Sequence, residues 1–172
     1  NALFIKADVM DESQIKTAVD SVIELHGHID ILFNNAGASV PGGVENTTTE
    51  QLHFAMDLLL GSVIHTTKYV VPHMKRQGFG RIINNASVAG HQTHYGRYLY
   101  SGAKAAVSHL TRVAGVELGR HGITANCISP GVTLTPILLK GSIPPEGITP
   151  EHEQAKLKKL GRLWANRSPL MR

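Results

Sequence analysis

The sequence of 172 residues predicts an α/β fold built on a parallel β-sheet with helices on both faces. Three short apolar runs carry this prediction, because each ends in small or polar residues, as buried parallel strands do. These runs begin at Ile29, Arg81 and Ile123, and they lead into Asn34–Gly37, Asn84–Ser87 and Ser129–Gly131. Segments with helical periodicity separate the runs. Ligands bind at the carboxyl ends of the strands in such sheets, which is where all three polar clusters fall.

The first elements are a strand over about Leu3–Ala7 and a helix that begins near Asp11. Asp11 and Gln14 have the spacing of a capping box, and Gly27 fits the position just past the helix end. The apolar stripe of this helix consists of Ile15, Ala18, Val19 and Val22. The strand Ile29–Phe33 follows.

A long helix is predicted next, from a cap formed by Thr47 and Glu50 to about Arg76. Pro72 is expected to bend or shorten it. The rest of the chain divides into a strand, a loop, a helix, a strand, a Pro- and Gly-rich loop and a last helix. In order, these cover Arg81–Ile83, Val88–Arg97, the segment around Tyr100 and Lys104, Ile123–Ile128, Val132–Pro150 and a helix from Thr149 to about Leu160.

Tyr100 and Lys104 lie four residues apart, which places them on the same face of a helix. A lysine ammonium near a phenol favours the phenolate, so such a pair can give or take a proton near neutral pH. Ser87 would supply a hydroxyl to the same substrate oxygen. Tyr-x-x-x-Lys alone is a weak signal, and a surface Tyr beside a solvated Lys is the alternative. The position of Ser87 at the end of a predicted strand favours the catalytic interpretation.

These residues, in this order, resemble the short-chain dehydrogenase/reductase family. The matching pieces run from Asn1 to about Thr135 and are Asp8-Val9, Asn34-Asn35-Ala36-Gly37, Ser87, Tyr100-x-x-x-Lys104, and Pro130-Gly131 with Thr135. The resemblance implies a Rossmann-type doubly wound sheet, NAD or NADP as the cofactor, and interconversion of a secondary alcohol and a ketone. It also implies that Ser87, Tyr100 and Lys104 are the catalytic residues.

The resemblance assigns further residues to the cofactor. Asp8 and Val9 match the pair that contacts adenine, and Asn35, Ala36 and Gly37 match the turn beside the adenosine ribose. Tyr100 and Lys104 lie at the nicotinamide, where Lys104 is implied to bind the ribose hydroxyls. The groups implied to hold the carboxamide and a nearby phosphate are Pro130, Gly131, Thr133 and Thr135. Asn34 is expected to tie neighbouring strands together instead, and Gly37 and Gly131 have the alternative role of tight turns.

One position departs from the family pattern. The family usually carries an Asn in the long helix, and the matching residue here is Leu59. In the family, the backbone carbonyl at this position holds a water that reaches the Lys. Leu59 keeps that carbonyl but lacks the amide that steadies the local bend, so a weakened proton relay is expected.

By the resemblance, the first predicted strand matches the family's third. The Gly-rich turn that receives the pyrophosphate would then precede Asn1, together with two strands, and the family's last strand would follow Arg172. We therefore expect one partial domain, residues 1–172, that belongs to a longer protein. Asn1–Ala7 would lack a strand to pair with and Ile29–Phe33 would expose an apolar edge, so the isolated chain is predicted not to fold stably.

The loop after Ser87 is expected to line the substrate pocket with His91, Gln92 and His94. Ten histidines raise the question of a metal site. His91 and His94 have no third ligand at metal-binding spacing, so no metal is predicted.

Composition narrows the class of protein further. The net charge of +4 is mild and scattered apart from Lys156, Lys158 and Lys159. That cluster could contact nucleic acid, but the solvated face of a short helix is the favoured interpretation, so no nucleic-acid partner is predicted. No apolar run approaches the roughly 20 residues that span a bilayer. The lone Cys127 fits a reducing compartment, so a cytoplasmic location is predicted. A homodimer or homotetramer is implied by the resemblance. Two alternatives stay open: a truncated, non-catalytic product that acts only by association, and a sugar-nucleotide epimerase or dehydratase that shares the Tyr-x-x-x-Lys pair.

Overall fold

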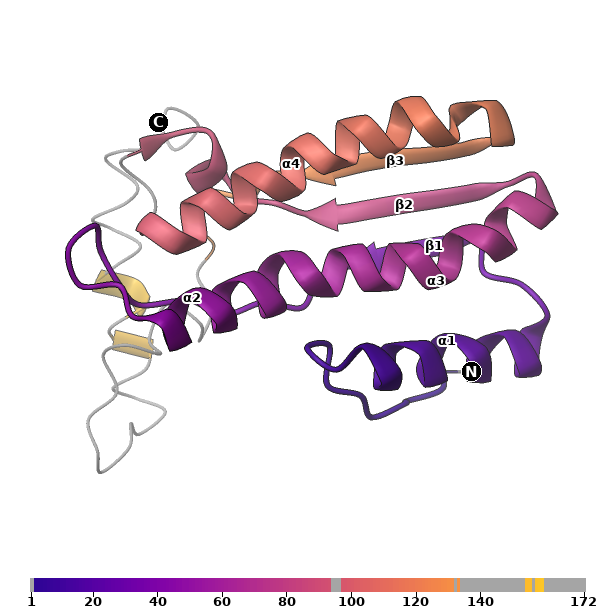
Figure 1. Ribbon diagram of the computed structural model, residues 1–172, viewed down its shortest axis with the longest axis horizontal. Helices are drawn as coiled ribbons and strands as arrows, with labels where there is room; N and C mark the ends of the chain where they lie inside the picture. The colour runs from indigo at the N-terminus through magenta and orange to yellow at the C-terminus, as the bar shows by residue number, and fades with distance from the viewer. Residues whose placement is uncertain (1, 94–96, 132, 134–153, 156, 160–172) are drawn as a thin grey trace. The chain divides into compact units, whose positions relative to one another are not determined.

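The computed structural model describes residues 2–93, 97–131, 133, 154, 155 and 157–159 (Figure 1). The chain divides into two compact units, residues 1–130 and 131–172. The sheet and the helices described below belong to the first unit. In the second unit, residues 154, 155 and 157–159 are helical and fall within the predicted last helix, whose predicted start at Thr149 lies outside the described residues.

The sheet consists of three parallel strands in the order β1-β2-β3, as Figure 1 shows. They are β1 Ile31–Asn34, β2 Gly80–Asn85 and β3 Ile123–Ile128. Each coincides with one of the three apolar runs, which confirms the predicted parallel sheet. The register sets Asn34 beside Asn84, and Asn84 beside Cys127. The polar residues that follow β1 and β2 are therefore brought to the same edge.

The helices are α1 Glu12–His26, α2 Thr49–Met56, α3 Ser62–Gln77 and α4 Tyr98–Leu118. In Figure 1, α3 and α4 run along one side of the strands and α1 lies beside α3. This face of the sheet carries the main core, formed by Val19, Val70, Met74, Ile82, Leu118 and Ile123. Among the described residues, none of these helices is long and apolar enough to cross a membrane.

The opposite face of the sheet carries no helix within the described part of the first unit. Ile31 and Phe33 on β1 are 61% and 51% exposed there, and Ile128 on β3 is 46% exposed. The expected cover on both faces is thus seen on one face only in the described residues. The predicted apolar edge is confirmed within them, because β1 is an edge strand with two large exposed apolar side chains.

The first predicted strand, Leu3–Ala7, is wrong. These residues pair with no strand in the described part of the chain, and Leu3 and Phe4 are 58% and 86% exposed. A β-strand is defined by hydrogen bonds to a neighbour, which an apolar sequence run cannot supply by itself. The sequence of Leu3–Ala7 therefore indicated a β-propensity, but a segment becomes a strand only when a neighbouring strand supplies its hydrogen bonds.

The predicted ends of α1 are confirmed. Asp11 is the N-cap, its carboxylate accepts hydrogen bonds from the backbone N–H groups of Ser13 and Gln14, and Gly27 has φ 75° at the other end. The capping box is not reciprocal, however, because the Gln14 side-chain oxygen accepts from the backbone N–H of Asp8 at 2.9 Å. The cap thus also fixes the turn that precedes the helix.

The long predicted helix is confirmed in position but corrected in three details. Its capping box is formed by Thr48 and Gln51, because the hydroxyl of Thr47 donates to the carbonyl oxygen of Gly43 at 2.7 Å. Pro72 does not shorten it, since α3 continues to Gln77. The regular α-helix is interrupted earlier, by a π-helical segment over Asp57–Gly61.

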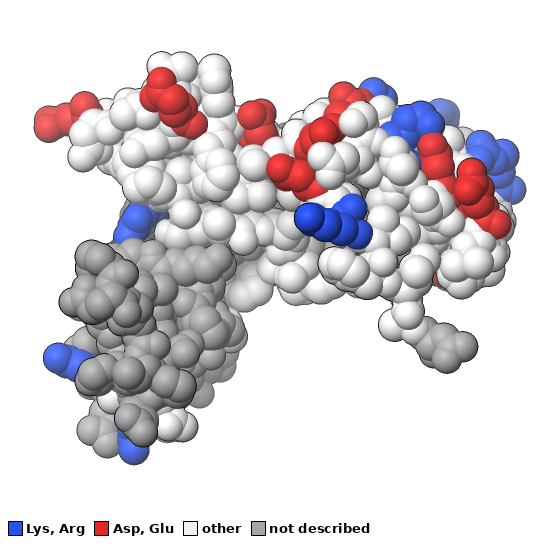
Figure 2. All heavy atoms as spheres, turned by 90° about the horizontal axis from the view of Figure 1, so that it is seen from below, with Lys and Arg blue, Asp and Glu red and all other residues white. Residues whose placement is uncertain are grey.

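The surface charge agrees with the sequence-based expectation of a mild, scattered distribution. Figure 2 shows acidic and basic side chains interspersed on the face that it displays.

Candidate active site

Ser87 lies directly beyond the end of β2 and caps a short 3₁₀ turn over Val88–Gly90. Its hydroxyl oxygen accepts a hydrogen bond from the backbone N–H of Ala89 at 3.2 Å. The backbone N–H of Val88 donates to the carbonyl oxygen of Pro130 at 3.1 Å, which ties this turn to the segment after β3. Ser87 is half-buried and therefore held in place with its hydroxyl at the carboxyl ends of the strands.

Gly90 brings the Ser87 turn against the helix that carries Tyr100 and Lys104. A Cβ added at Gly90 would lie 2.8 Å from the backbone N of Ala105 and 2.9 Å from the carbonyl carbon of Lys104. Because such contacts are too short for any side chain, only glycine permits this approach. The turn therefore packs directly on the α4 backbone at Lys104.

Lys104 is buried, with 5% of its surface exposed. Its ammonium donates a hydrogen bond of 2.6 Å to the carbonyl oxygen of Asn85 and lies 5.9 Å from the centroid of the Tyr100 ring. Burial lowers the pKa of Lys104 from its usual 10.5. The ammonium has three N–H donors, and its one hydrogen bond among the described residues leaves two available for a ligand.

Gly37 in the Asn-Asn-Ala-Gly turn lies next to Lys104. A Cβ added there would lie 3.9 Å from Lys104 Nζ and 3.4 Å from Leu59 Cδ2. Asn35, Ala36 and Gly37 are exposed. The turn after β1, the end of β2 and the first turns of α4 thus meet around one ammonium group.

Tyr100 is half-buried and packs against an apolar cluster at the start of α4. The buried members of this cluster are Val40, Ala55, Leu59, Leu99 and Ala103. Through Lys104, the structure brings Tyr100 close to Asn85, which lies two residues before Ser87. No hydrogen bond joins Ser87 to Tyr100 in the described part of the chain.

Leu59 lies inside the π-helical segment and is only 1% exposed. The helix therefore departs from regular α geometry at this point although the family's usual Asn is absent. Apolar packing around Leu59 accompanies this departure, and the expected weakening of the proton relay stays a prediction. Nothing in the spacing of Asp57–Gly61 distinguishes a π-helical segment from an ordinary one, which is why the sequence did not indicate it.

Two consecutive asparagine pairs join β1 to β2. In the first, Asn34 Nδ2 donates to Asn84 Oδ1 at 2.8 Å, which fits the prediction that Asn34 ties strands together. Asn84 Nδ2 donates to the Thr111 hydroxyl at 2.9 Å, and the Thr66 hydroxyl donates to Asn34 Oδ1 at 2.6 Å. The side-chain oxygen and nitrogen of both Asn34 and Asn84 therefore have a hydrogen-bond partner on α3, α4 or the facing strand.

In the second pair, Asn85 Nδ2 donates to Asn35 Oδ1 at 2.8 Å. The other amide atom, Asn85 Oδ1, is buried and accepts no hydrogen bond within the described residues. Asn85 is therefore a candidate site residue that the sequence analysis missed. The sequence does carry a signal, because Asn-Asn stands at the ends of both β1 and β2. Side chains alternate along a strand, so the two consecutive asparagines at each strand end point to opposite faces of the sheet.

Asp8 and Val9 lie in the turn before α1. Asp8 Oδ1 accepts from the backbone N–H of Met10 at 2.9 Å, and the carbonyl oxygen of Asp8 accepts from the N–H of Asp11 at 3.1 Å. Asp8 is exposed and Val9 half-buried. No hydrogen bond joins this turn to the Lys104 group within the described residues.

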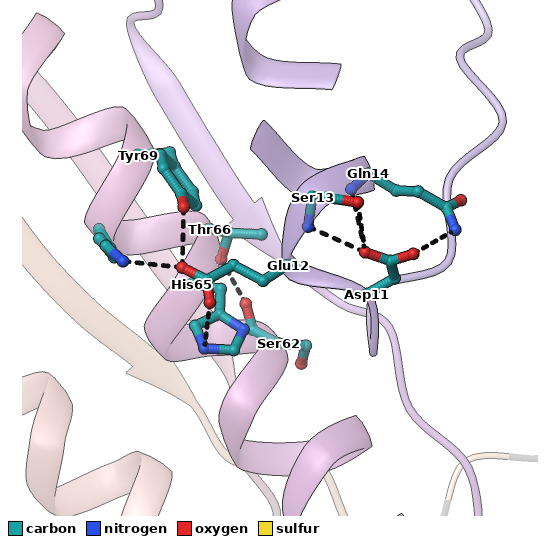
Figure 3. Close-up of polar contacts among 9 residues, drawn as sticks. Asp11, Glu12, Ser13, Gln14, Ser62, His65, Thr66 and Tyr69 are labelled. Atoms are coloured by element: carbon teal, nitrogen blue, oxygen red, sulfur yellow. Dashed lines mark hydrogen bonds and ion pairs between the residues drawn. The ribbon is translucent and has the colours of Figure 1, made fainter. Parts of the chain in front are cut away.

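Glu12 anchors the start of α1 to α3 (Figure 3). Its carboxylate accepts from the Lys68 ammonium and the Tyr69 hydroxyl, both at 2.7 Å, and lies 3.7 Å from His65 Nε2. The hydrogen bond from Lys68, followed by that from Tyr69, lowers the pKa of Glu12. These partners are more than 50 residues apart in sequence, so no local pattern could have revealed them.

The predicted substrate and carboxamide residues are only partly described. His91 Nε2 lies 3.1 Å from the Ser129 hydroxyl, and the backbone N–H of Gln92 donates to the carbonyl oxygen of Val88 at 2.8 Å. Within the second unit, the Thr133 hydroxyl lies 3.5 Å from the carbonyl oxygen of Gly131. His94 and Thr135 lie outside the described residues. No cluster of possible metal ligands occurs among the residues that the structure describes.

A parallel sheet with a Tyr-Lys helix at the carboxyl ends of its strands defines a Rossmann-type α/β protein. Residues 1–142 match the model of the family described as short chain dehydrogenase. The chain belongs to this short-chain dehydrogenase/reductase family.

Two curated relatives illustrate the similarity. An uncharacterised oxidoreductase of Schizosaccharomyces pombe is 40% identical over 136 residues, which cover 78% of this chain and 52% of the relative. The 2-(R)-hydroxypropyl-CoM dehydrogenase of Xanthobacter autotrophicus is 37% identical over 138 residues, covering 78% and 55%. The chain thus spans about half the length of the curated relatives it matches.

Solved structures show the same similarity. A short-chain dehydrogenase/reductase from Burkholderia xenovorans has a TM-score of 0.82 at 30% identity, covering 96% of this chain and 60% of the other. An NAD⁺-bound xylitol dehydrogenase has a TM-score of 0.69 at 34% identity, covering 73% and 48%. A gluconate 5-dehydrogenase from Burkholderia cenocepacia in complex with NADP and tartrate has a TM-score of 0.69 at 33% identity, covering 72% and 49%. Structural relatives therefore bind either NAD⁺ or NADP.

Proposed function

We propose that the intact protein interconverts a secondary alcohol and a ketone with NAD or NADP as the hydride carrier. The observation that carries this proposal is the buried Lys104 ammonium, held by the carbonyl oxygen of Asn85 and 5.9 Å from the Tyr100 ring. Burying an ammonium is costly unless its charge is used or paired. A phenol beside it is the group whose ionisation that charge favours.

The residues around Lys104 fit a dinucleotide. Two ammonium donors and the buried acceptor Asn85 Oδ1 remain available to hydroxyl groups, and the exposed turn over Asn35–Gly37 lies against Lys104. When bound, the nicotinamide ring would supply hydride transfer. The residues proposed to hold the cofactor are Asp8, Val9, Asn35, Ala36, Gly37, Tyr100, Lys104, Pro130, Gly131, Thr133 and Thr135.

Tyr100 is the proposed acid and base. In the oxidation direction its phenolate oxygen removes the proton from the substrate hydroxyl, and in reduction its hydroxyl returns a proton to the carbonyl oxygen. Ser87 donates a hydrogen bond to that same oxygen and stabilises its negative charge as it develops. Lys104 favours the phenolate through its positive charge, which the surrounding protein screens less than water would.

The proposed substrate is a small molecule that carries a secondary hydroxyl or a keto group, with His91, Gln92 and His94 near it. Relatives that are named as dehydrogenases of hydroxylated compounds support this class. Its identity would be read by the loop after Ser87, because loops vary between relatives while the strand ends are held by backbone hydrogen bonds.

Replacing Tyr100 by Phe in the intact protein tests the proposal. The variant keeps the ring in its apolar cluster but removes the proton-carrying oxygen, so kcat should fall by at least ~100-fold, the scale of general acid–base catalysis. Cofactor binding, measured by fluorescence titration with NADH and NADPH, should persist.

Tyr98→Phe is the matched control for this experiment. Tyr98 begins the same helix two residues earlier and is 57% exposed, so removing its hydroxyl should leave kcat unchanged. Near-native turnover of the Tyr100→Phe variant would refute the assignment of Tyr100.

A further inference from the structure

Asn85 combines three features that no other residue at the strand ends shares within the described part of the chain. Its backbone carbonyl oxygen holds the Lys104 ammonium at 2.6 Å, and its side-chain nitrogen holds Asn35 Oδ1 at 2.8 Å. Its side-chain oxygen is buried without a hydrogen-bond donor. A single residue thus connects the turn after β1 to the catalytic lysine and keeps one acceptor free.

Whichever way the Asn85 amide is oriented, one of its buried side-chain atoms has no partner, and in the orientation that the structure shows this atom is the oxygen. If its oxygen and nitrogen were exchanged, together with those of Asn35, the bond between the two side chains would survive. One buried polar atom of Asn85 would still lack a partner. Buried polar groups are almost always paired, so an orphan at a candidate ligand site indicates a group that a ligand completes.

The Asn34–Asn84 pair shows that a position at the end of β2 does not by itself leave an asparagine side-chain atom unpaired. Asn84, one residue earlier on β2, uses both its side-chain oxygen and its nitrogen in hydrogen bonds to Asn34 and Thr111. The difference arises because Thr111 on α4 and Asn34 on β1 bond both side-chain atoms of Asn84, whereas no described residue donates to Asn85 Oδ1.

On the basis of the proposed function, we propose that Asn85 Oδ1 accepts a hydrogen bond from a ribose hydroxyl of the bound dinucleotide. In the orientation that the structure shows, the unpaired atom is an acceptor, and the phosphates of a dinucleotide carry no donor at neutral pH, so they cannot complete it. Ribose hydroxyls can, and the two groups that Asn85 contacts, Asn35 and Lys104, are those proposed to face the adenosine and nicotinamide riboses. Asn85 is then a cofactor-binding residue in addition to the residues that the family resemblance implies.

Asn85→Leu in the intact protein tests this role. Leu has nearly the same size and shape but cannot accept a hydrogen bond, so the Kd for NADH or NADPH should rise about tenfold. The ligand-free variant should unfold at the same temperature or a higher one, because the substitution removes an unsatisfied buried acceptor. Titrations with adenosine monophosphate and with nicotinamide mononucleotide show which ribose is involved, since only the half that bonds Asn85 should lose affinity.

Two variants separate this role from others. Asn85→Asp keeps oxygen acceptors at the same place but cannot donate to Asn35, so it should bind the dinucleotide more tightly than Asn85→Leu. Asn84→Leu should lower the unfolding temperature and leave the Kd unchanged, because Asn84 belongs to the satisfied network on the other face.

The outcomes are distinguishable from those of the proposed function. If the unmodified protein binds neither dinucleotide, the proposed function fails. If it binds one and Asn85→Leu binds it equally well, the role of Asn85 is refuted. Equal weakening by Leu and Asp would also refute it, because an acceptor oxygen at this position would then make no difference to binding. A loss of stability without a change in Kd would assign Asn85 to the scaffold.

Discussion

Two asparagine pairs at the ends of the same two strands have opposite relations to their surroundings. Asn34 and Asn84 face the helices and reach partners on α3 and α4 through Thr66 and Thr111. Asn35 and Asn85 lie one residue further along, and the Asn85 side-chain oxygen has no partner among the described residues. The residue type, the strands and the position at the sheet edge are nearly the same.

The difference teaches how a polar cluster at a sheet edge divides into scaffold and site. A satisfied buried network stabilises one arrangement of strands and helices and has nothing left to offer a ligand. An unsatisfied acceptor beside a buried ammonium costs stability in the free protein and is available to a ligand. Hydrogen-bond satisfaction therefore separates the two roles where residue identity does not.

Among the substitutions that test this comparison, Lys104→Met is expected to have the largest effect, which is a loss of kcat. Lys104→Met removes the charge that favours the phenolate, so kcat of the intact protein should fall by ~100-fold or more. The unfolding temperature at neutral pH should not fall, because Met fills a similar volume without burying a charge. Lys16→Met, at an exposed lysine of α1, should change neither kcat nor this temperature. A strong loss of stability in Lys104→Met would place Lys104 with the scaffold.

The pH dependence of Lys104→Met sharpens this test. The pKa of Lys104 is lowered by burial, so the unfolded chain binds its proton more tightly than the folded protein does. Stability of the unmodified protein should therefore gain from this group as pH rises through the lowered pKa toward 10.5. Thermal unfolding from pH 7 to pH 11 should show the stability difference between the unmodified protein and the Met variant narrowing.

A second, smaller effect is expected in the satisfied network. Thr111→Val keeps the shape of a side chain that is 3% exposed but leaves Asn84 Nδ2 without its acceptor, which should cost about 1–3 kcal/mol in the free energy of unfolding. Denaturant titration measures this cost, and the Kd for the dinucleotide should not change. Thr124→Val on β3, where the side chain is exposed, is the control. A change in Kd without loss of stability in Thr111→Val would erase the distinction between the two pairs.

The smallest effect is expected at the exposed polar contacts around the start of α1. Hydrogen bonds from the Ser13 and Gln14 side chains lower the pKa of Asp11 from 3.8 to about 2, and Lys68 and Tyr69 lower that of Glu12. Because both pKa values are lower in the folded protein, these groups stabilise it above about pH 4, and this contribution is lost as pH falls toward 2. Carboxyl titration by NMR should find the Asp11 midpoint near 2.

A variant of Glu12 complements the carboxyl titration. Glu12→Gln should lower the unfolding temperature slightly at pH 6, and the difference from the unmodified protein should vanish as pH falls below the Glu12 pKa. Glu24→Gln, at an exposed glutamate further along α1, is the control and should leave the unfolding temperature at pH 6 unchanged. An Asp11 midpoint near 4 would mean that its hydrogen bonds do not persist in solution.

The strands and helices were largely predictable because their signals are local. Three apolar runs became the three strands, and the Asp11 and Gly27 caps bound α1 as predicted. The mistakes concern features that depend on distant groups. The strand over Leu3–Ala7 lacks a neighbour, and the cap at Thr48 replaces Thr47 because Gly43 takes the Thr47 hydroxyl.

The site was predictable to a different extent. Ser87, Tyr100 and Lys104 could be chosen from spacing and family resemblance, and the structure brings the lysine, the tyrosine ring and the end of β2 together. Their catalytic roles remain a proposal. The doubled Asn-Asn indicated that Asn85 faces away from Asn84, but its unpaired oxygen depends on distant segments, as do the partners of Glu12. The sequence therefore did not identify either residue as part of a site.

The sequence by itself determined the parallel α/β order, the ends of α1 and the family, because hydrophobic period, capping chemistry and motif order are properties of residues close together in the chain. The tertiary structure alone decided which asparagine of each pair is satisfied, which lysine is buried and which face of the sheet the helices cover. Those outcomes depend on how donors, acceptors and apolar surfaces from distant segments meet, and a hydrogen bond between segments 50 residues apart has no local signature.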